Sequence, residues 1–179
     1  MKKVFCLILC LFVIISCIGC SPNNFFNITE ETITDLVEEL AQSRIKEILM
    51  PCDMTINKTV NVDGVILNLN GHTLTTSETI FLRNGGTITN GTIIMNANYE
   101  KARAIVVTGA PSSIKNITLK VSAPGNADGI QVTRKVNIEN VDVIVTTKAS
   151  NADIIGIRCF VAGEVIIKNS NIKTATPYG

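Results

Sequence analysis

A short phrase built around Asn or Gly recurs between residues 67 and 172, and it constrains the fold more than any other feature of the chain. Two residues before each of these pivots, and again three residues after it, stands an aliphatic side chain. The pivots are Gly71, Asn90, Asn116, Asn140 and Asn169. Asn and Gly adopt positive φ most readily. We therefore predict a strand, a one-residue left-handed corner and a second strand in each repeat.

The aliphatic positions form columns that run through the repeats. The column before the pivot is Leu69, Ile88, Ile114, Ile138 and Ile167. The column after the pivot is Leu74, Ile93, Leu119, Val143 and Ile172. A third column, upstream of the last four pivots, is Ile80, Ile105, Ile130 and Ile157. An amphipathic helix would not keep Asn or Gly at a fixed corner, so each repeat is predicted to hold two or three short strands.

The spacing between pivots, 19 to 29 residues, predicts a solenoid. In a solenoid, equivalent strands stack in parallel, about 4.8 Å apart, and bury their inward side chains against the turns on either side. The alternative is a β-sandwich of antiparallel hairpins, which also gives short strands at regular intervals. A sandwich has no reason to repeat an Asn corner at the same place in every unit, so we favour the solenoid.

Five phrases of the repeat, with NADGIQV ahead of one of them, resemble the right-handed parallel β-helix of the pectin-lyase-like superfamily. They are LNLNGHTL, TITNGTI, SIKNITL, NIENVDV and IKNSNI. The resemblance covers about residues 55–173, and it implies an all-β fold, a right-handed parallel β-helix of about five turns within residues 52–179. That superfamily includes polysaccharide lyases, glycoside hydrolases, phage tailspikes and surface adhesins, so the resemblance is specific to the fold and not to an activity.

Residues 1–19 are predicted to be a secretory signal peptide. Lys2 and Lys3 precede an apolar stretch of 15 residues, 4–18, which is shorter than the roughly 20 residues that span a bilayer. Gly19-Cys20 resembles the end of a bacterial lipobox, which implies cleavage before Cys20 and acylation of Cys20. Cys17 stands where that pattern prefers Leu, and an ordinary cleaved signal or an uncleaved anchor are the alternatives. We expect an exported, membrane-anchored lipoprotein, periplasmic or on the cell surface.

The next two segments are predicted to connect the anchor to the solenoid and to cap it. Residues 20–28 would hold the lipid and form a polar tether, and residues 29–51 would contain an N-terminal capping α-helix and a first strand. The apolar residues of the helix follow a helical period: Ile33, Leu36, Val37, Leu40 and Ala41. A solenoid has an open apolar end with unpaired strand edges, and such a helix would cover it.

No comparable cap follows the last repeat. We expect either a partner at that end, through end-to-end or trimeric self-association, or a shortened copy of a longer β-helix protein. Cys52 and Cys159, the two cysteines beyond Cys20, fall at opposite ends of the predicted stack. A disulfide needs Cα atoms within about 7 Å, so none is expected between them. Cys159 is predicted to be an inward-facing or stacked small apolar residue.

The segment NADGI, residues 126–130, is the candidate for chemistry. It resembles the Asn-Thr-Asp-Gly motif of the polygalacturonase-like glycoside hydrolases, and this resemblance implies that Asp128 is one of a cluster of catalytic acids. The rest of that pattern is missing: where the family has paired aspartates the chain has Ala152-Asp153, and neither Gly-His-Gly nor Arg-Ile-Lys follows. Asp153 and Arg158 are secondary candidates. The alternative is that Asp128-Gly129 simply turns the chain into the next strand.

A metal, a cofactor and nucleic acid are not expected. A polysaccharide lyase, one of the alternatives for this fold, would need calcium bound by a cluster of carboxylates. Here Lys115 and Lys168 occupy the same position in the repeat as Glu139, which predicts an alternating salt-bridge ladder on a solvated face. His72, the single histidine, is expected to be a surface corner residue rather than a base. The 16 basic and 15 acidic residues form no basic stripe that would indicate nucleic-acid binding.

We expect a non-catalytic module that presents a rigid face for binding a glycan or a surface protein. The alternative is an enzyme that degrades acidic polysaccharides, with Asp128 and Asp153 as acids and Arg158 or Lys168 gripping a uronate carboxylate. A third alternative is a shortened copy without retained function.

Few side chains suit a sugar platform, because aromatic residues make up 4% of the chain. Tyr99 and Phe160 are the aromatic candidates that would stack on a sugar ring. Arg103, at the end of the loop that contains Tyr99, is a candidate polar contact to the same glycan.

Overall fold

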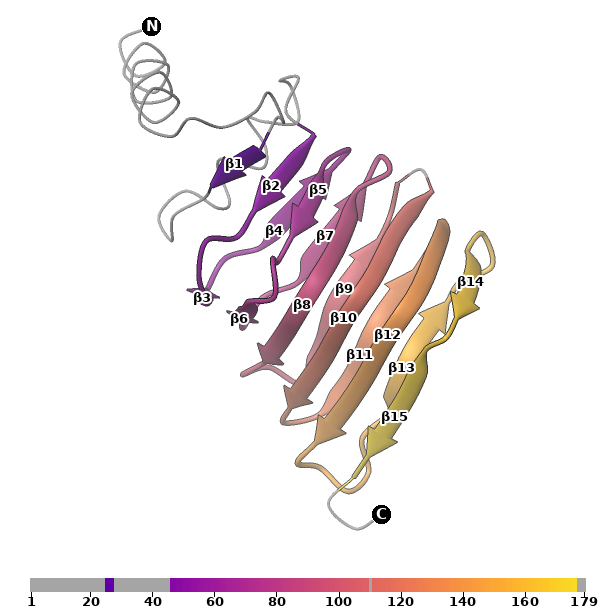
Figure 1. Ribbon diagram of the computed structural model, residues 1–179. Helices are drawn as coiled ribbons and strands as arrows, with labels where there is room; N and C mark the ends of the chain where they lie inside the picture. Colours follow the sequence, from indigo (N-terminus) through magenta and orange to yellow (C-terminus); the bar gives the residue numbers. More distant parts are fainter. Residues whose placement is uncertain (1–24, 28–45, 110, 177–179) are drawn as a thin grey trace, which may run out of the picture.

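The computed structural model describes residues 25–27, 46–109 and 111–176, and it is an all-β parallel solenoid of about four turns (Figure 1). The predicted all-β parallel solenoid is confirmed. The predicted signal peptide and cap helix lie outside the described residues. Within the described ranges, no helix has the length and apolar character needed to cross a membrane.

Two parallel sheets face each other across the core. The ten-stranded sheet contains β1 (Phe25–Asn27), β2 (Glu47–Leu49), β3 (Met54–Ile56), β5 (Ile66–Asn68), β6 (Thr73–Thr76), β8 (Thr87–Asn96), β10 (Ser112–Ala123), β12 (Lys135–Thr147), β14 (Glu164–Lys168) and β15 (Asn171–Ala175). The five-stranded sheet contains β4 (Val60–Asp63), β7 (Ile80–Arg83), β9 (Lys101–Val107), β11 (Asn126–Val132) and β13 (Ile154–Cys159). β1 lies within residues 20–28 and pairs with β2.

The predicted columns stand in register, with one correction. The column that contains Ile114, the one that contains Leu119 and the one that contains Ile130 each pair from turn to turn as expected. In the first turn, however, Leu67 and not Leu69 pairs with Ile88. The reason is that the first corner contains two residues with positive φ, Asn70 and Gly71, so it is longer than the others.

The later corners are left-handed single residues, as predicted. Asn90, Asn116, Asn140 and Asn169 have φ between 48° and 58°. The side chains of three of them, with Asn68 of β5, also form a ladder that the repeat did not predict. The Nδ2 atoms donate to Oδ1 of the preceding turn over 3.0 Å from Asn140 to Asn116, 3.1 Å from Asn116 to Asn90 and 3.2 Å from Asn90 to Asn68. The turns from Asn68 to Asn140 are thus bonded by these side chains as well as along the strands.

The interior is filled by the inward aliphatic residues, most of them fully buried. Both described cysteines, Cys52 and Cys159, are free and exposed. Cys159 shares the register of the buried Val132, as an inward position would. The expectation that Cys159 packs within the stack is nevertheless wrong, because β13 is the last strand of its sheet among the described residues, and none of these covers Cys159 from beyond.

The predicted charge ladder is correct in its register and wrong in its contacts. Lys115, Glu139 and Lys168 occupy equivalent positions on β10, β12 and β14. No ion pair within 4.0 Å joins them, although all three belong to the described part of the chain. The neighbouring pair Lys135 and Glu164 does form one, at 2.7 Å, between exposed side chains. Such a contact contributes little to the free energy of unfolding.

The two roles of a corner Asn can be separated at Asn116. Asn116→Ala removes the side-chain hydrogen bonds and leaves a residue with a Cβ atom at φ 52°. Asn116→Gly removes the same hydrogen bonds, but glycine adopts that φ without strain. We expect both variants to unfold at lower urea concentration, and Ala to cost about 1 kcal/mol more than Gly because of the left-handed backbone. Equal losses would show that backbone conformation contributes nothing at this corner.

Candidate functional site

The outer face of the five-stranded sheet carries the candidate site, and a bend in its strands shapes it. Side chains normally alternate between the two faces of a strand. In β9, however, the consecutive Ala104 and Ile105 both belong to the core. In β11, Gly129 faces Val143 of the opposite sheet and the next residue, Ile130, is also in the core. The alternation therefore shifts by one residue at the bend.

Glycine at the bend permits the close approach of neighbouring strands. A Cβ atom on Gly129 would lie 2.6 Å from the carbonyl oxygen of Gly156 and 2.7 Å from Cγ1 of Val143. Asp128 and Gly129 both lie inside β11, which begins at Asn126. The alternative that they turn the chain into the next strand is therefore wrong. Instead, Gly129 allows the close packing at the bend, and the bend places Asp128 on the outer face.

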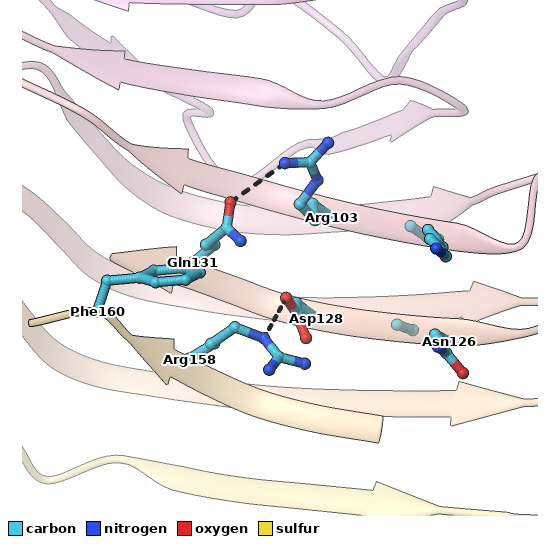
Figure 2. Close-up of a pocket in the computed structure, with 9 residues that line it drawn as sticks. Arg103, Asn126, Asp128, Gln131, Arg158 and Phe160 are labelled. Atoms are coloured by element: carbon cyan, nitrogen blue, oxygen red, sulfur yellow. Dashed lines mark hydrogen bonds and ion pairs between the residues drawn. The ribbon is translucent and has the colours of Figure 1, made fainter. Parts of the chain in front are cut away.

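A shallow pocket of about 400 Å³ lies over this bend (Figure 2). It is lined by Lys101, Ala102, Arg103, Asn126, Ala127, Asp128, Gln131, Arg158 and Phe160. The residues come from β9, β11 and β13 and from the segment that follows β13. Three cationic side chains and one carboxylate face the pocket, so it suits a polar ligand, and an anionic one better than a cationic one.

Arg158 brings the predicted acidic residues together. Its Nε donates to Oδ2 of Asp128 over 2.8 Å, and its Nη2 donates to Oδ2 of Asp153 over 3.0 Å. The side chain of Asp128 is 9% exposed, whereas that of Asp153 is 59% exposed. The hydrogen bond to Asp128, followed by that to Asp153, raises the pKa of Arg158 above its ordinary value. The guanidinium is therefore permanently charged, and both carboxylates act as its acceptors.

Other polar groups fix the surroundings of this cluster. Arg103 Nη1 lies 3.4 Å from Oε1 of Gln131, a long hydrogen bond that leaves most of the guanidinium free. The Asn126 side chain accepts from the backbone N–H of Asp153 over 2.9 Å, and the Ala127 N–H donates to the Asp153 carbonyl over 3.0 Å. The loop that carries Asp153 is thus bonded to the start of β11.

The aromatic candidates occupy different places. Phe160 lines the pocket and is 45% exposed. Tyr99 does not line the pocket; it is partly buried and packs against the core. Burial raises the pKa of the Tyr99 hydroxyl above its ordinary value, and a hydrogen bond with Thr79 lowers it by less. The structure therefore places Phe160 and Arg103 at the site and leaves Tyr99 outside it.

Two further sequence candidates lie away from the pocket. Lys168 belongs to β14 in the ten-stranded sheet, so it does not share a face with Arg158 on β13. His72 lies near Asp53, with Nδ1 3.4 Å from Oδ1, and Asp53 also accepts from the Thr73 N–H over 2.8 Å. Asp53 was not recognised as a partner of His72 from the sequence, because the two residues belong to different turns.

Sequence reasoning also missed Lys101, Asn126 and Gln131 as pocket residues. Lys101 pairs with Asn126 on the neighbouring strand, and Gln131 follows the core residue Ile130 by one position. The alternation of faces after Ile130 was a usable signal for Gln131. Within the described ranges, no group of three His, Cys, Asp or Glu residues is arranged to hold a metal ion.

Comparison of the chain with models of known protein families, with curated proteins and with solved structures gives no match. The feature that decides the chemistry of the site is the position of Arg158, whose guanidinium donates one hydrogen bond to each of the two carboxylates.

The ion cluster is expected to stabilise the last turns through the buried member, Asp128. Arg158→Gln leaves the Asp128 carboxylate without its charged partner, and we expect a loss of about 1 to 3 kcal/mol in urea unfolding. Asp153→Asn removes a contact of an exposed group and should cost less than about 1 kcal/mol. The double variant Arg158→Gln/Asp128→Asn should recover part of the loss. If the double variant loses as much stability as Arg158→Gln and Asp128→Asn lose together, the assigned pairing is contradicted.

Proposed function

We propose that the chain is a non-catalytic β-solenoid module that binds a glycan in the pocket on its five-stranded sheet. The observation that carries this proposal is the contact of both candidate acids with Arg158. Glycoside hydrolysis requires one carboxyl group that carries a proton and a second that is free to act as base or nucleophile. Here both carboxylates accept hydrogen bonds from a single permanently charged guanidinium, which suits them to hold Arg158 in place.

The pocket has the parts that sugar recognition uses. Phe160 offers an exposed aromatic face, and sugar rings stack on such faces. Arg103, Lys101 and Gln131 offer donors to hydroxyl or carboxylate oxygens along the same strip of the sheet. These side chains stand on strands held in register by the stack, so the ligand meets a preformed surface.

The alternative function is a polysaccharide-degrading enzyme that acts on acidic glycans. The convergence of Asp128 and Asp153 on the Arg158 guanidinium, which lines the pocket, favours it. On this alternative, Arg103 would bind a uronate carboxylate, because Lys168 lies in the other sheet. Membership of the pectin-lyase-like superfamily is likewise a proposal, supported by the repeated corner phrases and by the parallel stack.

Glycan binding is tested with the purified full chain on immobilised polygalacturonate and on neutral glycans, with product formation followed in parallel. We expect retention without cleavage. Affinity should fall about tenfold for Arg103→Gln, which loses one charge-assisted contact, and about tenfold for Phe160→Ala, which loses one stacking contact. Arg83→Gln and Phe81→Ala are matched controls, because these residues lie on the same sheet outside the pocket. They form a cation–π pair, with Cζ of Arg83 5.2 Å from the centroid of the Phe81 ring. Cleavage that Asp128→Asn abolishes would instead establish the enzyme.

We also propose that the module is attached to a membrane through lipidated Cys20. The support is the sequence of residues 1–20, with two lysines, an apolar stretch and Gly19-Cys20. In a bacterial host that processes lipoproteins, fatty-acid labelling should be present in the unmodified chain and in Cys17→Ala, and absent from Cys20→Ala. Labelling that persists in Cys20→Ala would refute the anchor.

A further inference from the structure

The pocket on the five-stranded sheet is longer along its strands than across them, and Figure 2 shows Phe160 and Asn126 at its two ends. Lys101 pairs with Asn126, and the Phe160 N–H donates to the Val132 carbonyl, which sets Phe160 beside Thr133. The seven steps from Asn126 to Thr133 extend no more than about 23 Å, whereas β9, β11 and β13 together cover about 10 Å. A linear oligosaccharide therefore fits the pocket lengthwise, along the strands.

The side of the pocket formed by β9 carries two cations without a carboxylate partner. Lys101 and Arg103 are exposed, and Ala102 between them belongs to the core, so the two cationic side chains point to the same face. Neither forms an ion pair with a carboxylate of the described residues. Residues two positions apart on a strand lie about 7 Å from each other. This part of the pocket therefore offers two positive charges to a ligand.

The ion cluster on the other side of the pocket has an acidic balance. Arg158 donates to both Asp128 and Asp153, so one positive and two negative charges gather there. Arg103 is the neighbour of Asp128 on β9, yet the Asp128 carboxylate bonds to Arg158 on β13. An anionic group of a ligand placed at this cluster would meet the carboxylates, and their repulsion would weaken binding. Charge in the ligand is therefore favoured at β9 and disfavoured at the cluster.

The Phe160 end of the pocket suits an uncharged sugar. Phe160 is half-exposed, Gln131 carries an uncharged amide, and the charge of Arg158 is balanced by its two carboxylates. An aromatic face and an amide match the apolar face and the hydroxyl groups of an uncharged ring. A charged sugar at this end would lose contact with water without gaining a cation of its own.

The charged and uncharged positions are close enough for adjoining sugar units. The Arg103 guanidinium reaches Gln131, with Nη1 3.4 Å from Oε1. Gln131 lies two positions before Thr133, the neighbour of Phe160, and two positions correspond to about 7 Å along the strand. In Figure 2 the ring of Phe160 extends toward Gln131. A group bound by Arg103 and a ring stacked on Phe160 therefore fit neighbouring units of one glycan chain.

We propose that the ligand is a heteroglycan in which an acidic unit adjoins an uncharged unit. The anionic group of the acidic unit binds Lys101 and Arg103, and the uncharged ring stacks on Phe160. This inference rests on the proposed glycan site and adds the charge pattern of its ligand. A uniformly acidic glycan would bring a second anionic group to the carboxylates, and a neutral glycan would leave the two cations of β9 unused. Attraction and repulsion thus both select the alternating pattern.

Calorimetric titration of the full chain with oligosaccharides of equal length tests the charge pattern. The probes are hyaluronan, which alternates a uronate with an uncharged N-acetylhexosamine, oligogalacturonate and carboxyl-reduced hyaluronan. We expect hyaluronan to bind about tenfold more tightly than the other two, because oligogalacturonate adds an unpartnered anionic group and the reduced glycan loses its charge-assisted contacts. Equal affinities, or tightest binding of another probe, would overturn the charge pattern and leave the glycan site standing. Binding of none would overturn both.

Single substitutions assign the two parts of the pocket. Lys101→Gln and Arg103→Gln should each weaken binding of hyaluronan about threefold more than they weaken binding of the carboxyl-reduced glycan. Phe160→Ala should weaken both by the same factor, about tenfold. Lys115→Gln is the matched control, because Lys115 is an exposed lysine of β10 in the other sheet. Equal losses on both glycans for Arg103→Gln, or an equally large loss for Lys115→Gln, would contradict the assigned position of the acidic unit.

Discussion

Turn-on-turn stacking at a fixed register is the interaction on which the structure depends. A single turn has too few inward side chains to bury its own apolar surface, so each aliphatic column is stable only when it continues above and below. The strand hydrogen bonds and the corner amides join the same pairs of turns. Burial, backbone pairing and corner conformation therefore all act along one axis, and a turn without a neighbour loses all three at once.

The sequence predicts most of the stack because the aliphatic columns and the Asn or Gly corners recur once per turn. It fails where position depends on more than the period. Leu69 was aligned wrongly because a gapless comparison cannot detect a corner with two left-handed residues. Cys159 has the phase of a core residue, but burial also requires a neighbour beyond it. The lysines beside Glu139 have the right register, yet solvated side chains need not meet.

The candidate site was predicted in part for a similar reason. Asp128, Asp153 and Arg158 were chosen from a motif and its charges, and the structure brings them into contact. Their contact could not be derived from spacing, because the bend at Gly129 changes which residues face outward. Gln131 and Arg158 face outward by alternation from Ile130 and Ile157, and the bend adds Asp128 to the same face. A shift of one residue in the alternation of faces is thus enough to bring these polar side chains together on one face of the sheet.

The asparagine ladder has a direction, and this direction restricts the chemistry of the corners. Every amide donates toward the first turn, and the series ends where Asn68 Nδ2 meets the Glu47 carboxylate at 2.6 Å. An acceptor-only group fits at that terminus and nowhere within the series. Aspartate tolerates left-handed backbone almost as well as asparagine, but between two amides it would set oxygen against oxygen. The corners thus discriminate between two nearly isosteric side chains by the sense of their hydrogen bonds.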